Sequence, residues 1–182
     1  MQNYNNGEVS MMVQLTDACE ILRWAEEAEI PVVLDGGWGV DALIGRETRT
    51  HNDIDLFVEE KDYQAFIEMI KVRGFCEVTM EYTTEHHTVW ADDKARIIDL
   101  HSFRYAQDGK IEYEGCMFPA KTFSGKGVIG NIAVQCIEPE SQVAFHQGYA
   151  FDENDVHDVK LLCETFGLAV PEEYQKLIKS AE

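Results

Sequence analysis

Apolar residues recur at the three- and four-residue spacing of an amphipathic helix in residues 17–29 and 62–73. Pro31 would end the first helix and Gly74 the second. The same criteria, with proline near a start and glycine after an end, predict further helices over residues 38–44, 139–149, 153–166 and 171–179.

Short apolar or alternating runs predict strands between these helices, at residues 32–34, 54–58, 75–81, 88–91, 95–103, 111–113 and near 132–137. We expect an α+β fold, in which a mixed β-sheet with a mostly antiparallel extension is backed by helices. The chain would form a single domain, 1–182. A sheet-containing catalytic core would extend to about residue 138, and a helical C-terminal portion would follow from about residue 139.

Composition narrows the class of partner. The 182 residues and a 45% hydrophobic content suffice for one domain with a real core. Fifteen basic and 34 acidic residues give a net charge of −19, which repels nucleic acid. The same charge suits a cationic small molecule, or serves only to keep the surface soluble.

Five widely spaced cysteines, odd in number and without a Cys-x-x-Cys pair, indicate buried thiols in a reducing cytosol. Residues 1–10 are polar, which is atypical of a secretory leader, and no apolar run is long enough to span a bilayer. We therefore expect a soluble, cytoplasmic protein.

Two acidic residues mark the candidate chemistry. Asp53 and Asp55 stand one residue apart beside an apolar run, so a strand would point both carboxylates to the same side. Two adjacent carboxylates repel each other, and Mg²⁺ bound to nucleotide phosphates is a common partner for such a pair. Asp99 lies in another apolar strand and would complete a three-carboxylate cluster, whereas an isolated Asp-x-Asp is more often a solvated turn.

A glycine pair upstream supplies a place for phosphate. Gly36 and Gly37 follow a predicted strand, and a backbone without Cβ lets amide N–H groups approach phosphate oxygens. Arg49, four residues before Asp53, would reach a triphosphate bound by the same metal. Each of these features alone is more often a simple turn or a surface charge.

These residues resemble the signature of the DNA polymerase β-type nucleotidyltransferase superfamily. The longer runs LDGGWGVDALIGR (34–46) and HNDID (51–55) are similar to antibiotic nucleotidyltransferases, especially the small lincosamide nucleotidyltransferases of the LinA/LnuA type. Aminoglycoside 2″-nucleotidyltransferases are more distant. The resemblance continues through IDLH (98–101), FHQGY (145–149) and ENDVHDVK (153–160).

The resemblance implies Mg²⁺-dependent transfer of a nucleoside monophosphate, usually AMP from ATP, onto an antibiotic hydroxyl. Asp53 and Asp55 would bind the metal, and Asp99 would be the third ligand or the general base. The triphosphate would contact Gly36, Gly37 and Arg49, with Arg46 a weaker candidate.

Several further residues are candidates for the substrate pocket. His101 shares a strand face with Asp99, and His146 and Tyr149 are three residues apart on a predicted helix. His101 could instead be a polar side chain at a sheet edge, and His146 and Tyr149 could instead serve helix packing. Asp155 and Asp158 would bind nucleotide or pair with a cation such as Arg46 or Lys160. Four aromatic residues could also line an acceptor pocket: Trp90, Phe103, Tyr105 and Tyr113. Aromatic residues in strands more often belong to the core.

His86 and His87 would face opposite sides of a strand, so one metal site using both is disfavoured and we expect a solvated loop. Three functional alternatives stay open: an aminoglycoside acceptor, a non-catalytic nucleotide-binding member of the fold, and nucleotidylation of a protein side chain. The expected partners are a nucleotide and a small antibiotic, without nucleic acid or membrane. A homodimer is an open alternative.

Overall fold

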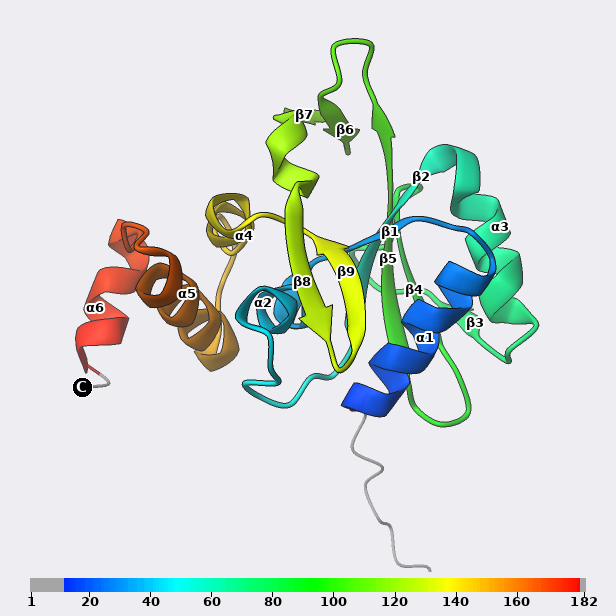
Figure 1. The fold of residues 1–182 in the computed structure, drawn as a ribbon, viewed down its shortest axis with the longest axis horizontal. Helices are drawn as coiled ribbons and strands as arrows, with labels where there is room; N and C mark the ends of the chain where they lie inside the picture. The colour runs from blue at the N-terminus through cyan, green and yellow to red at the C-terminus, as the bar shows by residue number, and fades with distance from the viewer. Residues whose placement is uncertain (1–11, 181–182) are drawn as a thin grey trace, which may run out of the picture.

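The computed structural model describes residues 12–180, with side chains through residue 177. A mixed sheet runs through its centre in the strand order β3-β4-β5-β2-β1-β9-β8 (Figure 1). Pairing is parallel between β2 and β5 and between β1 and β9, and antiparallel elsewhere. The strands are β1 (Val32–Leu34), β2 (Ile54–Glu59), β3 (Cys76–Val78), β4 (His87–Ala91), β5 (Ile97–Tyr105), β8 (Gly125–Ile129) and β9 (Ile132–Cys136).

A small hairpin and six α-helices complete the fold. Strands β6 (Ile111–Tyr113) and β7 (Cys116–Phe118) pair with each other, and β6 pairs with the end of β5. A 3-10 helix, η1 (Ala120–Phe123), follows. The α-helices are α1 (Leu15–Glu27), α2 (Gly36–Ile44), α3 (Glu60–Lys71), α4 (Pro139–Phe145), α5 (Glu153–Phe166) and α6 (Glu172–Ser180).

The helices flank the sheet on two sides. Helices α1 and α3 lie at one side, whereas α4, α5 and α6 lie at the other, with α2 between them and the sheet (Figure 1). Helix α2 contacts β2 and β8 as well as α4 and α5. It therefore connects the sheet core to a separate apolar cluster built by α2, α4, α5 and α6.

Alternation along the central strands places the acidic residues. Ile54 and Leu56 of β2 and Ile98 and Leu100 of β5 point into the main core. The intervening positions of the same strands therefore face the opposite side. These positions include Asp55, Phe57, Asp99, His101 and Phe103.

The predicted α+β class and mixed sheet are confirmed, but some boundaries differ. The helix predicted over 139–149 is wrong beyond Phe145, because His146 leaves helical geometry and Gly148 adopts a φ of +87°. Helix α2 starts at Gly36, two residues earlier than predicted. Strands β7 and β8 were not predicted, because their short sequences are exposed or rich in glycine.

The expectation of five buried thiols is wrong for two of them. Cys76 and Cys116 are exposed, whereas Cys19, Cys136 and Cys163 are buried, and all five are free. Both exposed thiols lie on three-residue strands that the core does not cover.

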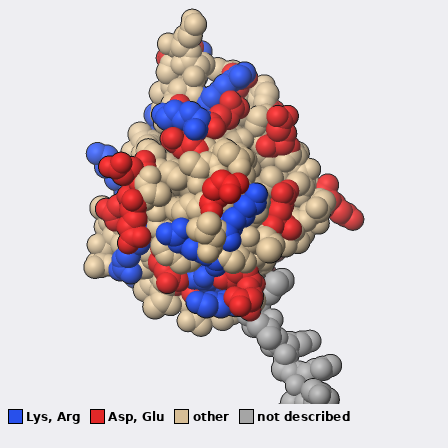
Figure 2. Space-filling model, turned by 90° about the vertical axis from the view of Figure 1, so that its right-hand side faces the viewer, with Lys and Arg blue, Asp and Glu red and all other residues tan. Residues whose placement is uncertain are grey.

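Charge is mixed on the face around α1 and α3, where Lys and Arg lie among Asp and Glu without forming a continuous basic surface (Figure 2). Within residues 12–180, no helix is both long and apolar enough to cross a membrane. The prediction for residues 1–10 falls outside the described residues.

Candidate active site

Three carboxylates converge in one cavity. Strands β2 and β5 lie side by side in parallel, with Asp55 directly opposite Asp99. Asp53 immediately precedes β2. All three line a cavity of about 700 Å³, together with Gly36 and Gly37. The structure thus brings together the acidic residues and the glycine pair that the sequence analysis singled out.

The carboxylates perturb one another. Burial and then the negative charges of Asp53, Asp99 and Asp35 raise the pKa of Asp55 well above its ordinary value. Burial and the Asp99 charge raise the pKa of Asp53, and the nearby Arg49 opposes this shift. A cation between these groups would relieve the repulsion and keep them ionised.

The glycine pair forms a tight approach to this cluster. Gly36 has a φ of +55°, and a Cβ atom there would overlap Asp55 Oδ2. A Cβ atom on Gly37 would overlap the Arg49 guanidinium. Both glycines belong to the first turn of α2, whose unpaired N–H groups and dipole favour an anion. Side chains at these two positions would block the space that a phosphate needs.

Arg49 is held in place from the C-terminal helices. Its Nε donates to Asp158 Oδ1 at 3.0 Å and its Nη2 donates to Asp158 Oδ2 at 2.7 Å. Arg49 lines the cavity, as predicted for a phosphate-binding residue. Arg46 is exposed and lies outside this lining. Asp158 therefore pairs with Arg49, a partner that the sequence analysis did not name when it offered nucleotide binding or a cation such as Arg46 or Lys160.

A buried aspartate that the sequence analysis did not select supports the loop that carries Arg49. Asp41 of α2 is 1% exposed and accepts hydrogen bonds from the Thr48 backbone N–H at 3.1 Å and from His51 Nε2 at 2.6 Å. The His51 ring packs on Trp38, with 4.2 Å between ring centroids. The signal in the sequence was an acidic residue inside an apolar helix, which requires a partner when buried.

Of the adjacent histidines His86 and His87, the second does not lie where the sequence predicts. His87 is not in a solvated loop, because β4 pairs antiparallel with β5 and sets His87 opposite His101. Its Nε2 is hydrogen-bonded to Asp99 Oδ1, and its side chain lines the cavity. His86 contacts Ser102 Oγ through Nδ1 at 2.9 Å, away from the cavity lining. The two rings face opposite ways, as expected, so only His87 joins the site.

His101 lies where the sequence analysis placed it. It lines the cavity beside Asp99 and stacks on Phe57, with 4.7 Å between ring centroids. Its Nδ1 lies 2.9 Å from Tyr113 Oη. Burial, assisted by the neighbouring His87, lowers the pKa of His101 to about 4, so its imidazole is neutral at pH 7.

The C-terminal part closes the other side of the cavity. His146 and Tyr149 both line it, although they lie after α4 and not on a common helix face. Tyr149 Oη donates to Asp155 Oδ1 at 2.7 Å. Asp35, at the start of the glycine run, also lines the cavity and accepts a hydrogen bond from the buried Gln142 at 2.9 Å. The aromatic residues proposed for an acceptor pocket lie outside this lining, namely Trp90, Phe103, Tyr105 and Tyr113.

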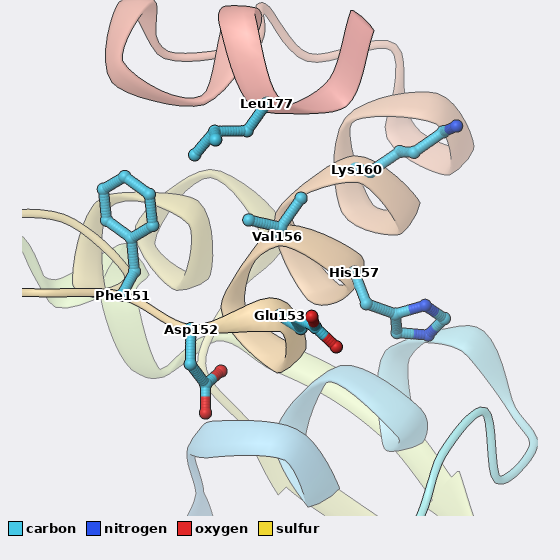
Figure 3. Close-up of a pocket in the computed structure, with 7 residues that line it drawn as sticks. All are labelled: Phe151, Asp152, Glu153, Val156, His157, Lys160 and Leu177. Carbon is cyan, nitrogen blue, oxygen red and sulfur yellow. The ribbon is translucent and has the colours of Figure 1, made fainter. Parts of the chain in front are cut away.

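A second cavity of about 590 Å³ adjoins this site between α5 and α6 (Figure 3). Phe151, Val156 and Leu177 supply its apolar wall, and Asp152 lines both cavities. The three-carboxylate cluster, the glycine turn and Arg49 all line the first cavity. We therefore take the first cavity as the candidate active site.

The arrangement suits phosphate chemistry on a hydroxyl group. Paired carboxylates provide oxygen ligands for a divalent cation, and the first turn of α2 provides N–H donors for phosphate oxygens. Asp99 stands beside them as a group able to accept a proton.

Comparisons with known proteins agree with this arrangement. The family model described as Aminoglycoside-2''-adenylyltransferase matches residues 17–162. A lincosamide resistance protein of Staphylococcus haemolyticus is 30% identical over 154 residues, covering 78% of this chain and 89% of the relative. A 2''-aminoglycoside nucleotidyltransferase of Klebsiella pneumoniae is 36% identical over 97 residues, covering 47% of this chain and 55% of the relative.

Two solved structures share the fold. The lincomycin-bound structure of the lincosamide antibiotic adenylyltransferase LnuA superposes with a TM-score of 0.73 at 28% identity, covering 83% of this chain and 97% of that one. The structure of ANT(2'')-Ia in complex with adenylyl-2''-tobramycin gives a TM-score of 0.69 at 21% identity, covering 92% and 95%.

Proposed function

Because the chain belongs to the aminoglycoside-2''-adenylyltransferase family, we propose that it transfers AMP from ATP onto a hydroxyl of a lincosamide antibiotic. The reaction would release pyrophosphate and inactivate the antibiotic. The observation that carries this proposal is the convergence of Asp53, Asp55 and Asp99 in one cavity beside the Gly36–Gly37 turn. An adenylyl transfer needs these components together: metal ligands, a phosphate cradle and a proton acceptor.

The residues present fit Mg²⁺. Asp53 and Asp55 offer only oxygen atoms, and burial together with neighbouring carboxylates raises the pKa of both, so a positive charge beside them would be stabilising. These two residues would hold the ion, with Asp99 as a third ligand or as the general base. When bound, Mg²⁺ neutralises the triphosphate and polarises the phosphorus that the hydroxyl attacks.

The chain's own groups then have distinct tasks. The N–H groups of the first α2 turn would orient phosphate oxygens, and Arg49 would add a positive charge at the same wall. The ion pair with Asp158 restricts the rotamers of Arg49 before ATP arrives, which lowers the entropy cost of binding. Asp99 would take the proton from the attacking hydroxyl.

The lincosamide acceptor is supported by the relative that aligns over most of this chain. His101, His146 and Tyr149 line the cavity around the acidic cluster, so they are the candidates to contact the acceptor.

An aminoglycoside is the second candidate acceptor, and one observation favours it. Beyond the three central acids, the cavity is lined by Asp35, Asp152 and Asp155, and the whole chain carries a net charge of −19. A polycation would gain more from this field than a lincosamide with one amine would. We place the reaction in the cytoplasm, where ATP is available and the five free thiols stay reduced.

The test measures pyrophosphate release from purified protein with MgATP and either lincomycin or tobramycin. We expect release with lincomycin, and its loss in Asp53→Ala. Asp93→Ala is the matched control, because this aspartate is exposed and lies outside the cavity lining. Release with tobramycin alone would transfer the proposal to the aminoglycoside class. If neither acceptor supports pyrophosphate release with any nucleoside triphosphate, the proposal is overturned.

A further inference from the structure

The cavity contains a second set of ligands that differs in chemistry from the Asp53–Asp55 pair. His87 from β4, and Asp99 and His101 from β5, each offer one ligand atom to the same part of the cavity. These three atoms all lie within 4.8 Å of one another. Two imidazole nitrogens and one carboxylate oxygen form the donor set of many transition-metal sites, whereas an all-oxygen pair suits Mg²⁺.

We propose that His87, Asp99 and His101 form a distinct site for one divalent transition-metal ion of the Zn²⁺ or Co²⁺ type. This site shares Asp99 with the cluster that Asp53 and Asp55 form, and its existence does not depend on which antibiotic the enzyme accepts. Nothing in the adenylyl transfer proposed above requires the two histidines as ligands.

The distances fit such an ion after a small adjustment. His101 Nε2 lies 3.7 Å from Asp99 Oδ1. Bonds of about 2 Å in a tetrahedral site set ligand atoms about 3.3 Å apart. The direct hydrogen bond between His87 Nε2 and Asp99 Oδ1 is shorter than this. It would open by rotation of the half-buried His87 side chain, which needs no movement of the paired strands.

The surroundings already orient the His101 imidazole. Tyr113 Oη contacts His101 Nδ1 at 2.9 Å, which leaves Nε2 as the free nitrogen on the cavity side. Phe57 stacks on one face of the His101 ring. The centroid of the His87 ring lies 4.2 Å from the centroid of the His101 ring. A ligand held as His101 is loses little side-chain entropy when an ion binds.

The test titrates Co²⁺ into the full-length, metal-free protein with a reductant present and follows the visible ligand-field bands. We expect one equivalent of Co²⁺ to give these bands without thiolate charge-transfer bands, and Zn²⁺ to displace it. His87→Gln and His101→Gln should each raise the Kd for Co²⁺ more than about tenfold. His86→Gln is the matched control, because His86 is adjacent in sequence but faces away, toward Ser102. Its Kd should stay within about twofold of the wild type.

Two further variants keep the result decisive. Tyr113→Phe removes only the hydroxyl that orients His101, so it should weaken Co²⁺ binding about tenfold while the ligands remain. Asp53→Asn should leave Co²⁺ binding within about threefold of the wild type. Unchanged affinity in both histidine variants would overturn the proposal, and so would loss of the ion in Asp53→Asn. None of these readouts measures adenylyl transfer, so this site can fail while the proposed function holds.

Discussion

The ion pair between Arg49 and Asp158 connects one wall of the cavity to helix α5, and its loss should lower the free energy of unfolding. The Asp158 side chain is 1% exposed and that of Arg49 is 20% exposed. Burial alone would raise the pKa of Asp158, but His146 and Arg49 hold it below its ordinary value. The charged form of Asp158 is therefore the form that the fold stabilises.

Removing one partner of a buried pair costs about 3–5 kcal/mol. Asp158→Asn keeps the shape and one hydrogen-bond acceptor, and Arg49 keeps some contact with solvent. We therefore expect this variant to lower the free energy of unfolding by about 2–3 kcal/mol, above the contribution of one ordinary hydrogen bond. The assay is urea unfolding at pH 7, followed by far-ultraviolet circular dichroism, with an unchanged slope against urea.

The control for this prediction is Glu164→Gln on the same helix. Glu164 lies 3.9 Å from Lys160 and its side chain is 63% exposed, so the change should cost less than about 0.5 kcal/mol. The double variant Arg49→Met, Asp158→Leu should be less destabilised than the sum of its single changes. If Asp158→Asn unfolds within about 0.5 kcal/mol of the wild type, the pair does not stabilise this junction and the reasoning is refuted.

Two other predictions test the glycine turn and the titration of a buried histidine. Gly36→Ala should reduce turnover more than about 100-fold, because its Cβ would overlap Asp55 at a φ of +55°, whereas Gly45→Ala, with φ +81° and open space, should lose only stability. Burial alone would lower the pKa of His146, but a carboxylate 3.8 Å away and other partners raise it. That stabilisation is complete below about pH 6.5 and fades as the pH rises through the folded-state pKa. His146→Gln should remove this loss of stability above pH 6.5. The control is His157→Gln, which changes an exposed histidine and keeps His146. If both variants lose stability equally steeply above pH 6.5, the assignment to His146 is contradicted.

The placement of several site residues was predictable from sequence where local rules apply. Alternation along a strand placed Asp53 and Asp55 beside each other, and an acidic residue in an apolar run marked Asp99 as a member of the same cluster. The position of the glycine pair at the cavity was predictable because a close approach of backbone to a site excludes Cβ.

What could not be predicted depends on pairing between distant segments. The role of His87 follows from its register opposite His101, which no local pattern encodes. The choice of Asp158 as partner for Arg49 requires α5 to pack beside the loop that carries Arg49, and the two residues are 109 positions apart in the sequence. Tyr149 lines the cavity as expected, but from the chain after α4, because the helix ends at Phe145 and not near Tyr149 as helical spacing predicted.

The central claim is that Asp53, Asp55 and Asp99 form one site for AMP transfer to an antibiotic. The most direct test is the mass of lincomycin after incubation with the enzyme and MgATP. The account predicts the addition of one AMP group by the wild-type protein and unmodified lincomycin with Asp53→Ala. Equal conversion by that variant, or a modified antibiotic that carries no AMP, would contradict it.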